Sequence, residues 1–234
     1  MCQRSSLSLL ILVFSFLASC GGKKKTTADV QPKDTNAINQ TAGQLNNSAD
    51  TSLSSLKPLL EKELGKWMQS FKDFNIDSFH QLNVQVFRED DYETVDDLRQ
   101  FYELYKPSLS FSPDSSQFID LYSNGVSLEK KGKKIIAIGD ADQGVTLCNL
   151  KTKSWKNILS FGPSASIEEA LWISPAEFIL AGSMQNDEGK QQPVLLVGNT
   201  DKRSFRWFEA ACIRNVAAKY EASGFSKLKI DEWE

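Results

Sequence analysis

The sequence contains a single histidine and only four cysteines in 234 residues, and this scarcity excludes several kinds of chemistry. A Ser–His–Asp hydrolase would have to use His80, and no Gly-x-Ser-x-Gly turn accompanies it. Clusters of Cys and His that bind zinc or haem are missing, as is a Gly-rich phosphate loop. The sequence therefore predicts no cofactor, no metal site and no identifiable catalytic residue.

A strong excess of charge of either sign is also lacking. The chain has 27 basic and 30 acidic side chains, which gives a net charge of −3. Both signs are interspersed, whereas a nucleic-acid-binding domain needs a basic face. We therefore expect no nucleic acid partner.

The longest apolar run, from Leu7 to Ala18, is shorter than the ~20 residues of a membrane-spanning helix. The run follows Arg4 and leads into Leu17-Ala18-Ser19-Cys20. A positive charge, a short apolar core and then small residues are typical of secretory signals. These four residues resemble the lipobox of bacterial lipoproteins. The resemblance implies that residues 1–19 are removed and that the Cys20 thiol, a nucleophile, receives the lipid. An ordinary cleaved signal peptide and a single N-terminal membrane helix are the alternatives.

The residues after Cys20 bear on location. Gly21-Gly22-Lys23-Lys24-Lys25 lacks the Asp next to the cysteine that retains many Gram-negative lipoproteins in the inner membrane, and it is basic rather than acidic. The resemblance thus implies an outer-membrane protein of the cell envelope that faces the periplasm, with its lipid anchor in the membrane. Three lysines beside anionic headgroups would add roughly 1 kcal/mol each of surface attraction.

The rest of the chain divides into a polar tether and one α+β domain. Residues 20–52 have few large apolar side chains, so we expect a flexible tether there. Residues 53–234 are long enough to form a core of their own. We expect a helical part over 53–107, a β-rich part over 108–209, and a C-terminal helix with a short strand over 210–234.

Helical periodicity dominates the start of this domain. An apolar stripe at helical spacing predicts one continuous helix that packs on a sheet, with a partner-binding or membrane-lying face as the alternative; it consists of Leu53, Leu56, Leu60, Leu64, Trp67, Phe71 and Phe74. Leu82, Val84 and Val86 then alternate with polar residues, which predicts a strand with one buried face. Thr94 and Asp97 form a capping box for a second helix that ends before Pro107.

From Leu109 onward the pattern predicts a mostly antiparallel β meander or curved sheet. Short turns separate the expected strands; they lie at Ser123-Asn124-Gly125, Lys131-Gly132, Asp142-Gln143-Gly144, Asp187-Glu188-Gly189 and Asn199-Thr200-Asp201. Asp140 and Asp142 could also suggest part of a calcium loop, but later ligands are missing, which favours a hairpin turn. At the C-terminus, Ala210 to Tyr220 predict a helix, Leu228 and Ile230 a strand, and Trp233 a cap on the core.

Two passages in the β-rich part are alike. Phe111-Ser112-Pro113 before Gln117-Phe118 matches Ile173-Ser174-Pro175 before Glu177-Phe178, and each passage continues into an apolar strand, a turn and an aromatic strand. This pattern is similar to blades of periplasmic β-propellers. Two blades cannot close a ring, so we expect propeller-like hairpins rather than a propeller.

The two remaining cysteines, Cys148 and Cys212, have two interpretations. The oxidising periplasm would allow a disulfide between them. Each also lies among apolar residues, as small buried side chains do.

Two functions follow from these features. The anchor, the tether and the lack of catalytic groups favour a non-enzymatic binding or scaffold module that contacts another envelope protein. The alternative is an envelope hydrolase that acts on glycan or peptide through a pair of carboxylates, which the sequence does not single out.

Overall fold

The computed structural model describes residues 52–88, 90–91, 97–218 and 220–234. The chain divides into two compact units, Met1–Gly43 and Gln44–Glu234, and every described residue belongs to the second. Cys20 and residues 20–51 of the expected tether lie outside the described residues.

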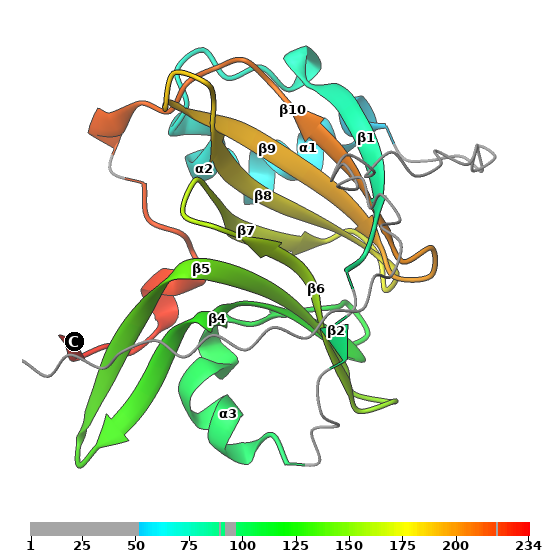
Figure 1. The fold of residues 1–234 in the computed structure, drawn as a ribbon. Helices are drawn as coiled ribbons and strands as arrows, with labels where there is room; N and C mark the ends of the chain where they lie inside the picture. The colour runs from blue at the N-terminus through cyan, green and yellow to red at the C-terminus, as the bar shows by residue number, and fades with distance from the viewer. Residues whose placement is uncertain (1–51, 89, 92–96, 219) are drawn as a thin grey trace, which may run out of the picture. The chain divides into compact units, whose positions relative to one another are not determined.

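Two antiparallel sheets form the body of the domain (Figure 1). The five-stranded sheet has the order β1-β10-β9-β8-β7, with β1 at His80–Val86, β7 at Ala165–Trp172, β8 at Glu177–Gln185, β9 at Gln191–Asn199 and β10 at Ser204–Glu209. The six-stranded sheet has the order β2-β6-β5-β4-β3, with β2 at Asp90–Asp91, β3 at Ser110–Phe111, β4 at Gln117–Lys131, β5 at Lys134–Asn149 and β6 at Ser154–Phe161. Its last member, β11 (Glu232–Trp233), pairs with β5 in parallel. The predicted β-rich, mostly antiparallel fold is confirmed.

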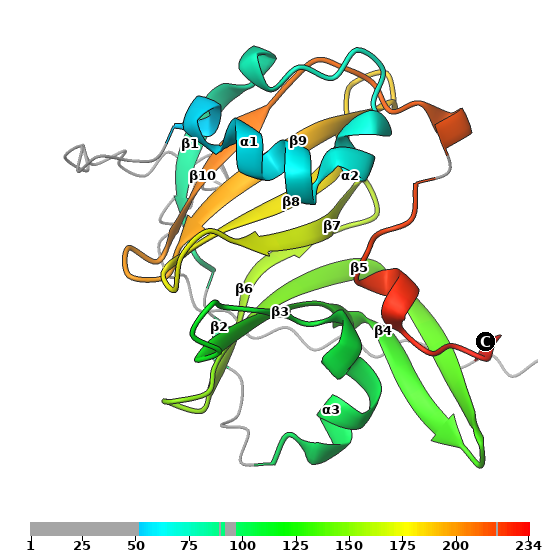
Figure 2. The same ribbon diagram turned by 180° about the vertical axis from the view of Figure 1, so that it is seen from behind.

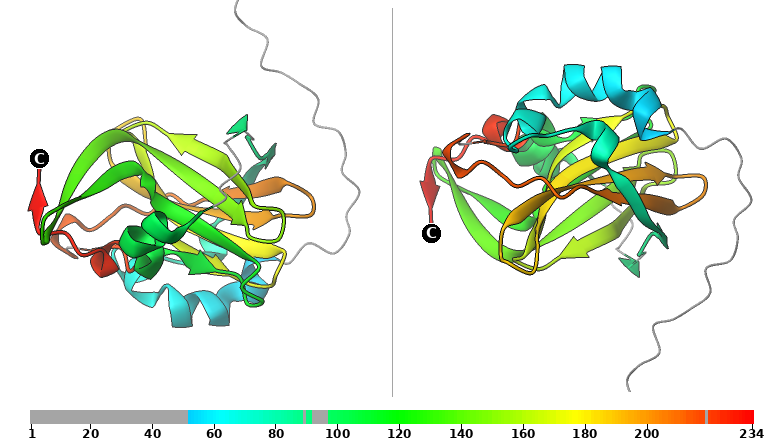
Figure 3. Two further views of the ribbon diagram at one scale, coloured as in Figure 1. Left: turned by 90° about the horizontal axis from the view of Figure 1, so that it is seen from below. Right: turned by 90° about the horizontal axis from the view of Figure 1, so that it is seen from above.

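The expected N-terminal helix is present as two pieces, α1 (Leu53–Glu63) and α2 (Gly65–Gln69), because the backbone leaves helical geometry at Leu64. The Ser52 hydroxyl accepts a hydrogen bond from the Ser55 N–H at 3.2 Å and caps the first turn. Both helices lie along one face of the five-stranded sheet (Figures 2 and 3). Their apolar stripe packs against Ile179, Leu195 and Phe208 of that sheet, so the stripe is core.

The opposite face of the five-stranded sheet packs against the six-stranded sheet. A second core, which we call the inter-sheet cluster, lies between the two sheets. It contains Phe178, Leu196 and Phe205 of the five-stranded sheet with Phe118 and Val145 of the six-stranded sheet. Successive residues of a strand point to opposite faces, so β8 and β9 are apolar along their length because both of their faces are buried.

Short helical segments complete the domain. They are α3 (Arg99–Tyr105) and four 3-10 turns, η1 (Ile76–Ser78), η2 (Lys106–Ser108), η3 (Val216–Ala218) and η4 (Phe225–Lys227). Helix α3 packs Phe101 against Phe118 and Trp155 of the six-stranded sheet. Of its expected capping box, Thr94 lies outside the described residues, and the Asp97 carboxylate accepts from the Arg99 N–H at 2.9 Å.

The repeated passages form two equivalent four-stranded meanders, which we call the first module (β3–β6) and the second module (β7–β10). In each, a serine hydroxyl accepts from the N–H that opens the next strand: Ser112 from Gln117 and Ser174 from Glu177, both at 3.0 Å. The turns before β6 and β10 also match, since Lys153 and Arg203 both have a φ of 53°. The described residues contain these two modules and no ring of blades.

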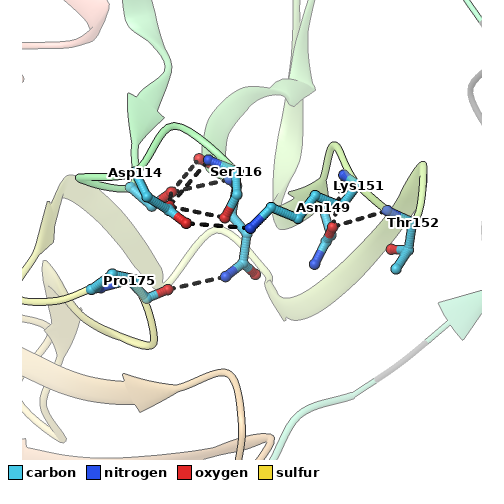
Figure 4. Close-up of polar contacts among 8 residues, drawn as sticks. Asp114, Ser116, Asn149, Lys151, Thr152 and Pro175 are labelled. Carbon is cyan, nitrogen blue, oxygen red and sulfur yellow. Dashed lines mark hydrogen bonds and ion pairs between the residues drawn. The ribbon is translucent and has the colours of Figure 1, made fainter.

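The turns at one end of the modules are tied together by side chains (Figure 4). Asn149 accepts from the N–H groups of Lys151 and Thr152, at 3.0 and 3.1 Å. The ammonium of Lys151 lies 3.5 Å from the carboxylate of Asp114. Gln117 of the first module donates to the carbonyl of Pro175 in the second at 3.0 Å.

Two of the predicted turns are wrong. Residues 123–125 and 142–144 lie inside β4 and β5, which continue past them as one long hairpin to Gly132. Both strands are irregular at the same place, where Asn124 is paired with Gly144. A Cβ on Gly144 would lie 2.1 Å from the Asn124 amide nitrogen, so glycine permits a close approach within the sheet rather than a reversal.

The predicted C-terminal helix is also wrong. Residues 210–218 contain only the single turn η3, because their backbone groups bond to neighbouring elements. Asn215 N–H donates to the Ser70 carbonyl at 2.7 Å, and Arg214 N–H donates to the Gln191 carbonyl at 2.8 Å. Trp233 does not cap the core, since it is 55% exposed and stacks on Phe225.

Candidate functional site

The cysteines singled out in the sequence are not brought together. Cys148 is buried in the inter-sheet cluster, whereas Cys212 is half-buried against the cluster beneath α1 and α2, and both thiols are free. The structure therefore gives the proposed disulfide no support. Burial raises the pKa of the Cys148 thiol to about 12 and also raises the pKa of Cys212, so neither is an activated nucleophile.

A β-bulge in β7 creates a pair of carboxylates that the sequence analysis missed. Ile167 pairs with Gly182 and Glu169 pairs with Ala181, so Glu168 is the extra residue. Glu168 accepts from the indole N–H of Trp67 on α2 at 2.8 Å, and Glu169 accepts from the Ser223 N–H at 2.5 Å. The signal in the sequence was two successive glutamates in a strand whose other residues, apart from Ser166, are apolar.

Each of these carboxylates is held by donors from the C-terminal segment. Arg214 binds Glu168 at 2.6 Å, with both side chains less than one fifth exposed. Glu169 accepts from the hydroxyls of Tyr220 and Ser223. Burial raises the pKa of Glu168 despite the opposing effect of Arg214, and burial together with Glu169 raises the pKa of Tyr220.

A hollow of about 860 Å³ opens next to this carboxylate pair. Its walls come from α1, α2 and the C-terminal segment, and Glu169, Tyr220 and Ser223 lie among its lining residues. The donors described above already engage the carboxylates of Glu168 and Glu169. Their geometry fixes the C-terminal segment to β7 and does not provide the free acid and base that glycoside hydrolysis requires.

The outer edge of β7 is closed by side chains of the first module. The Gln143 amide donates to the Ile167 carbonyl at 2.9 Å and accepts from the Ile167 N–H at 2.7 Å. The Ser110 hydroxyl donates to the Ala170 carbonyl at 2.9 Å, and the Tyr122 hydroxyl donates to the Glu168 carbonyl at 3.3 Å. These backbone groups of β7, which could otherwise pair with another strand, therefore have hydrogen-bond partners.

The opposite edge of the five-stranded sheet, β1, differs from β7 in its burial. The prediction of a buried face is wrong, because all seven residues of β1 are exposed. Leu82, Val84 and Val86 are 45%, 49% and 69% exposed, although their alternation with polar residues is that of a half-buried strand. The pattern predicted a buried face, and no described element covers it.

Nothing in the sequence of β1 discourages another strand from pairing with it. Gln81–Val86 contains no charged residue and no proline, two of the usual protections of an edge. A bulge at Leu82 near its start is the one irregularity in its pairing with β10. The other exposed large apolar residues of the described chain, Ile138, Val216 and Trp233, lie elsewhere. The edge of β1 is therefore the best candidate for a functional surface.

None of the helices in the described ranges is long and apolar enough to cross a membrane. Within the same ranges, no three His, Cys, Asp or Glu side chains are grouped to hold a metal ion. Comparisons with models of protein families, with curated proteins and with solved structures found no match.

Proposed function

We propose that this chain is a lipid-anchored protein of the bacterial cell envelope, held at the outer membrane on the periplasmic side, and that its β domain is a non-enzymatic binding module. The lipobox-like Leu17-Ala18-Ser19-Cys20 and the polar stretch after it support the anchor and the tether. The binding role rests on one observation, the bare apolar edge of β1.

The contrast between the two edges of the five-stranded sheet supports this role. Three side chains of the first module bond to the backbone of β7, whereas β1 presents Leu82, Val84 and Val86 to solvent. Exposed strand edges bind extended segments through backbone hydrogen bonds, and alternate side chains then provide specificity. A docking role accounts for an apolar edge that would otherwise be a liability.

The anchor is tested by Cys20→Ser in the full-length chain. We expect the variant to lose incorporation of labelled fatty acid and to leave the membrane fraction, because the thiol is the attachment point. Cys212→Ser is the matched control and should leave labelling and fractionation unchanged. Retention of the Cys20→Ser chain in membranes would overturn the anchoring proposal.

The binding role is tested by placing the photo-crosslinker p-benzoylphenylalanine at Val84 in the full-length chain and irradiating intact cells. We expect a discrete protein adduct at position 84 and none with the same probe at Val216, which is 92% exposed but lies in a 3-10 turn. Equal adducts, or none, at the two positions would contradict a docking role for β1.

A further inference from the structure

The last strand, β11, lies on an edge of the six-stranded sheet that β6 leaves open. β6 pairs with β5 from Gln143 onward, so the part of β5 that begins at Lys134 has no β6 partner on that side. β11 pairs there with Ile136 and Ala137, parallel to β5 (Figure 3). We propose that this edge of β5 is a binding site for an extended acidic segment of a partner protein, and that β11 occupies it in cis as a competitor.

The backbone contacts of this edge are those that an extended segment makes. The Asp231 N–H donates to the Ile135 carbonyl at 2.8 Å, and the Ile135 N–H donates to the Asp231 carboxylate at 2.7 Å. Further along, the Glu234 N–H donates to the Ala137 carbonyl at 3.0 Å. Strand addition of this kind supplies affinity through the main chain, so a segment from another protein can make the same bonds.

Two lysines of the β4–β5 hairpin add a preference for negative charge. Lys134 pairs with Glu232, and Lys131 pairs with Glu234 at 2.7 Å. All four side chains are about half exposed, so these ion pairs add little stability, but they fix which charges suit the edge. A phosphate group would satisfy the lysines and would leave the N–H and carbonyl of Ile135 without a strand to bond. The occupant that matches the whole edge is therefore an acidic peptide segment.

Few contacts hold β11 in place. It has two residues, both exposed, and the ring of Trp233 lies 6.1 Å from that of Phe225. A segment with little buried apolar surface lies at the low-stability end of a fold. β11 covers only Ile136 and Ala137, and the described strands leave residues 138–142 unpaired on this side of β5. A longer segment from a partner can therefore form more backbone bonds than β11 does and displace it.

The test uses the full-length chain in detergent and a fluorescent peptide with the sequence of residues 228–234, followed by fluorescence anisotropy. In the wild type, β11 competes with the peptide, so the apparent affinity is reduced to the fraction of chains whose edge is open. Glu232→Lys places two ammonium groups together and opens the edge, so we expect it to bind the peptide about tenfold tighter or more. Trp233→Ala, which removes the ring contact with Phe225, should also tighten binding.

A charge-matched pair of variants tests the site itself. In the Glu232→Lys background, Lys134→Glu should weaken peptide binding about tenfold or more, because a glutamate of the peptide then meets a carboxylate. Lys133→Glu makes the same charge change in the neighbouring turn and should leave the affinity within about twofold. Hydrogen exchange at the Glu234 N–H should be faster in Glu232→Lys than in the wild type, since its bond to β5 is then broken more often.

Three results would overturn the proposal. One is an equal loss of binding from Lys133→Glu and Lys134→Glu, which would indicate non-specific attraction. Another is that neither Glu232→Lys nor Trp233→Ala binds the peptide better than a scrambled peptide of the same composition. The third is a wild-type dimer in sedimentation that Glu232→Lys dissociates, which would assign the edge to strands exchanged between copies. The photo-crosslink at Val84 tests the β1 edge separately, so either proposal can fail without the other.

Discussion

The side-chain amide of Gln143 pairs with the backbone of Ile167 as a neighbouring strand would. Its nitrogen donates to the Ile167 carbonyl and its oxygen accepts from the Ile167 N–H, at 2.9 and 2.7 Å. The same nitrogen donates to the Leu121 carbonyl at 3.0 Å, so one amide joins the two sheets. This contact closes the edge of β7 and leaves β1 as the sheet's open edge.

Gln143→Ala should therefore destabilise the domain by about 2–3 kcal/mol, because the N–H and carbonyl of Ile167 lose their partners in a partly buried position. Urea unfolding measures the change. Gln81→Ala, which removes an exposed amide of β1, should change stability by less than about 0.5 kcal/mol. Equal effects of the two substitutions would contradict the bridging role.

We expect Asp114 to make the free energy of unfolding of the domain depend on pH in the acidic range. Hydrogen bonds from Ser112 and Ser116, with a smaller contribution from Lys151, hold the pKa of this carboxyl well below its ordinary value of 3.8. A lowered pKa contributes stability that is present above the ordinary value and is lost as the pH falls through the folded-state value.

The pH dependence of Asp114 is measured in two ways. The stability advantage of the wild-type chain over Asp114→Asn should be constant near neutral pH and should shrink only in strong acid. An NMR titration of the Asp114 carboxyl checks the cause, and Ser116→Ala should move its pKa upward. A midpoint that is unchanged in Ser116→Ala would argue against hydrogen bonding as the cause.

Glu169→Gln should loosen the C-terminal segment. The carboxylate accepts from the Tyr220 hydroxyl and from the N–H and hydroxyl of Ser223, whereas an amide replaces one acceptor by a donor. We expect a loss of about 1–3 kcal/mol and faster hydrogen exchange at the Ser223 N–H. Glu221→Gln, at an exposed neighbouring position, is the control and should alter neither measurement.

The two free cysteines should differ in reactivity. Cys148 is buried, and with a pKa of about 12 only about one thiol in 10⁴ is ionised at pH 8. Cys212 is half-buried and should react first with a thiol reagent in the native protein. Denaturation of the processed, lipidated chain without reductant should expose two reactive thiols, and the absence of both would indicate a disulfide between Cys148 and Cys212.

Local sequence patterns predicted most of the strands and the helical core. The stripe from Leu53 to Phe71 and the apolar stretches of β8 and β9 follow the periods of helix and strand, so their burial was readable from spacing. The matched Ser-Pro turns also identified the repeat, because a serine that bonds the next strand's N–H acts within a few residues.

Sequence patterns did not predict the features that depend on contacts between residues far apart in the chain. The sequence around Gly144 suits a turn, yet in β5 the glycine accommodates the Asn124 side chain of the neighbouring strand. Ala210 to Tyr220 have helical spacing, but Ser70 and Gln191 bind the backbone of this segment instead. The carboxylate pair of Glu168 and Glu169 depends on a bulge, which no local pattern marks.

The sequence by itself determined that this is a β-rich domain with an apolar helix packed on it, because periodicity records which side chains avoid water. Only the tertiary structure decided which of these apolar side chains remain exposed to solvent. The alternation in β1 is identical to that of a buried strand, and its exposure depends on which elements pack nearby. Burial is a property of the assembled sheets, so the open edge became visible only once β1 and β7 had been placed at opposite margins.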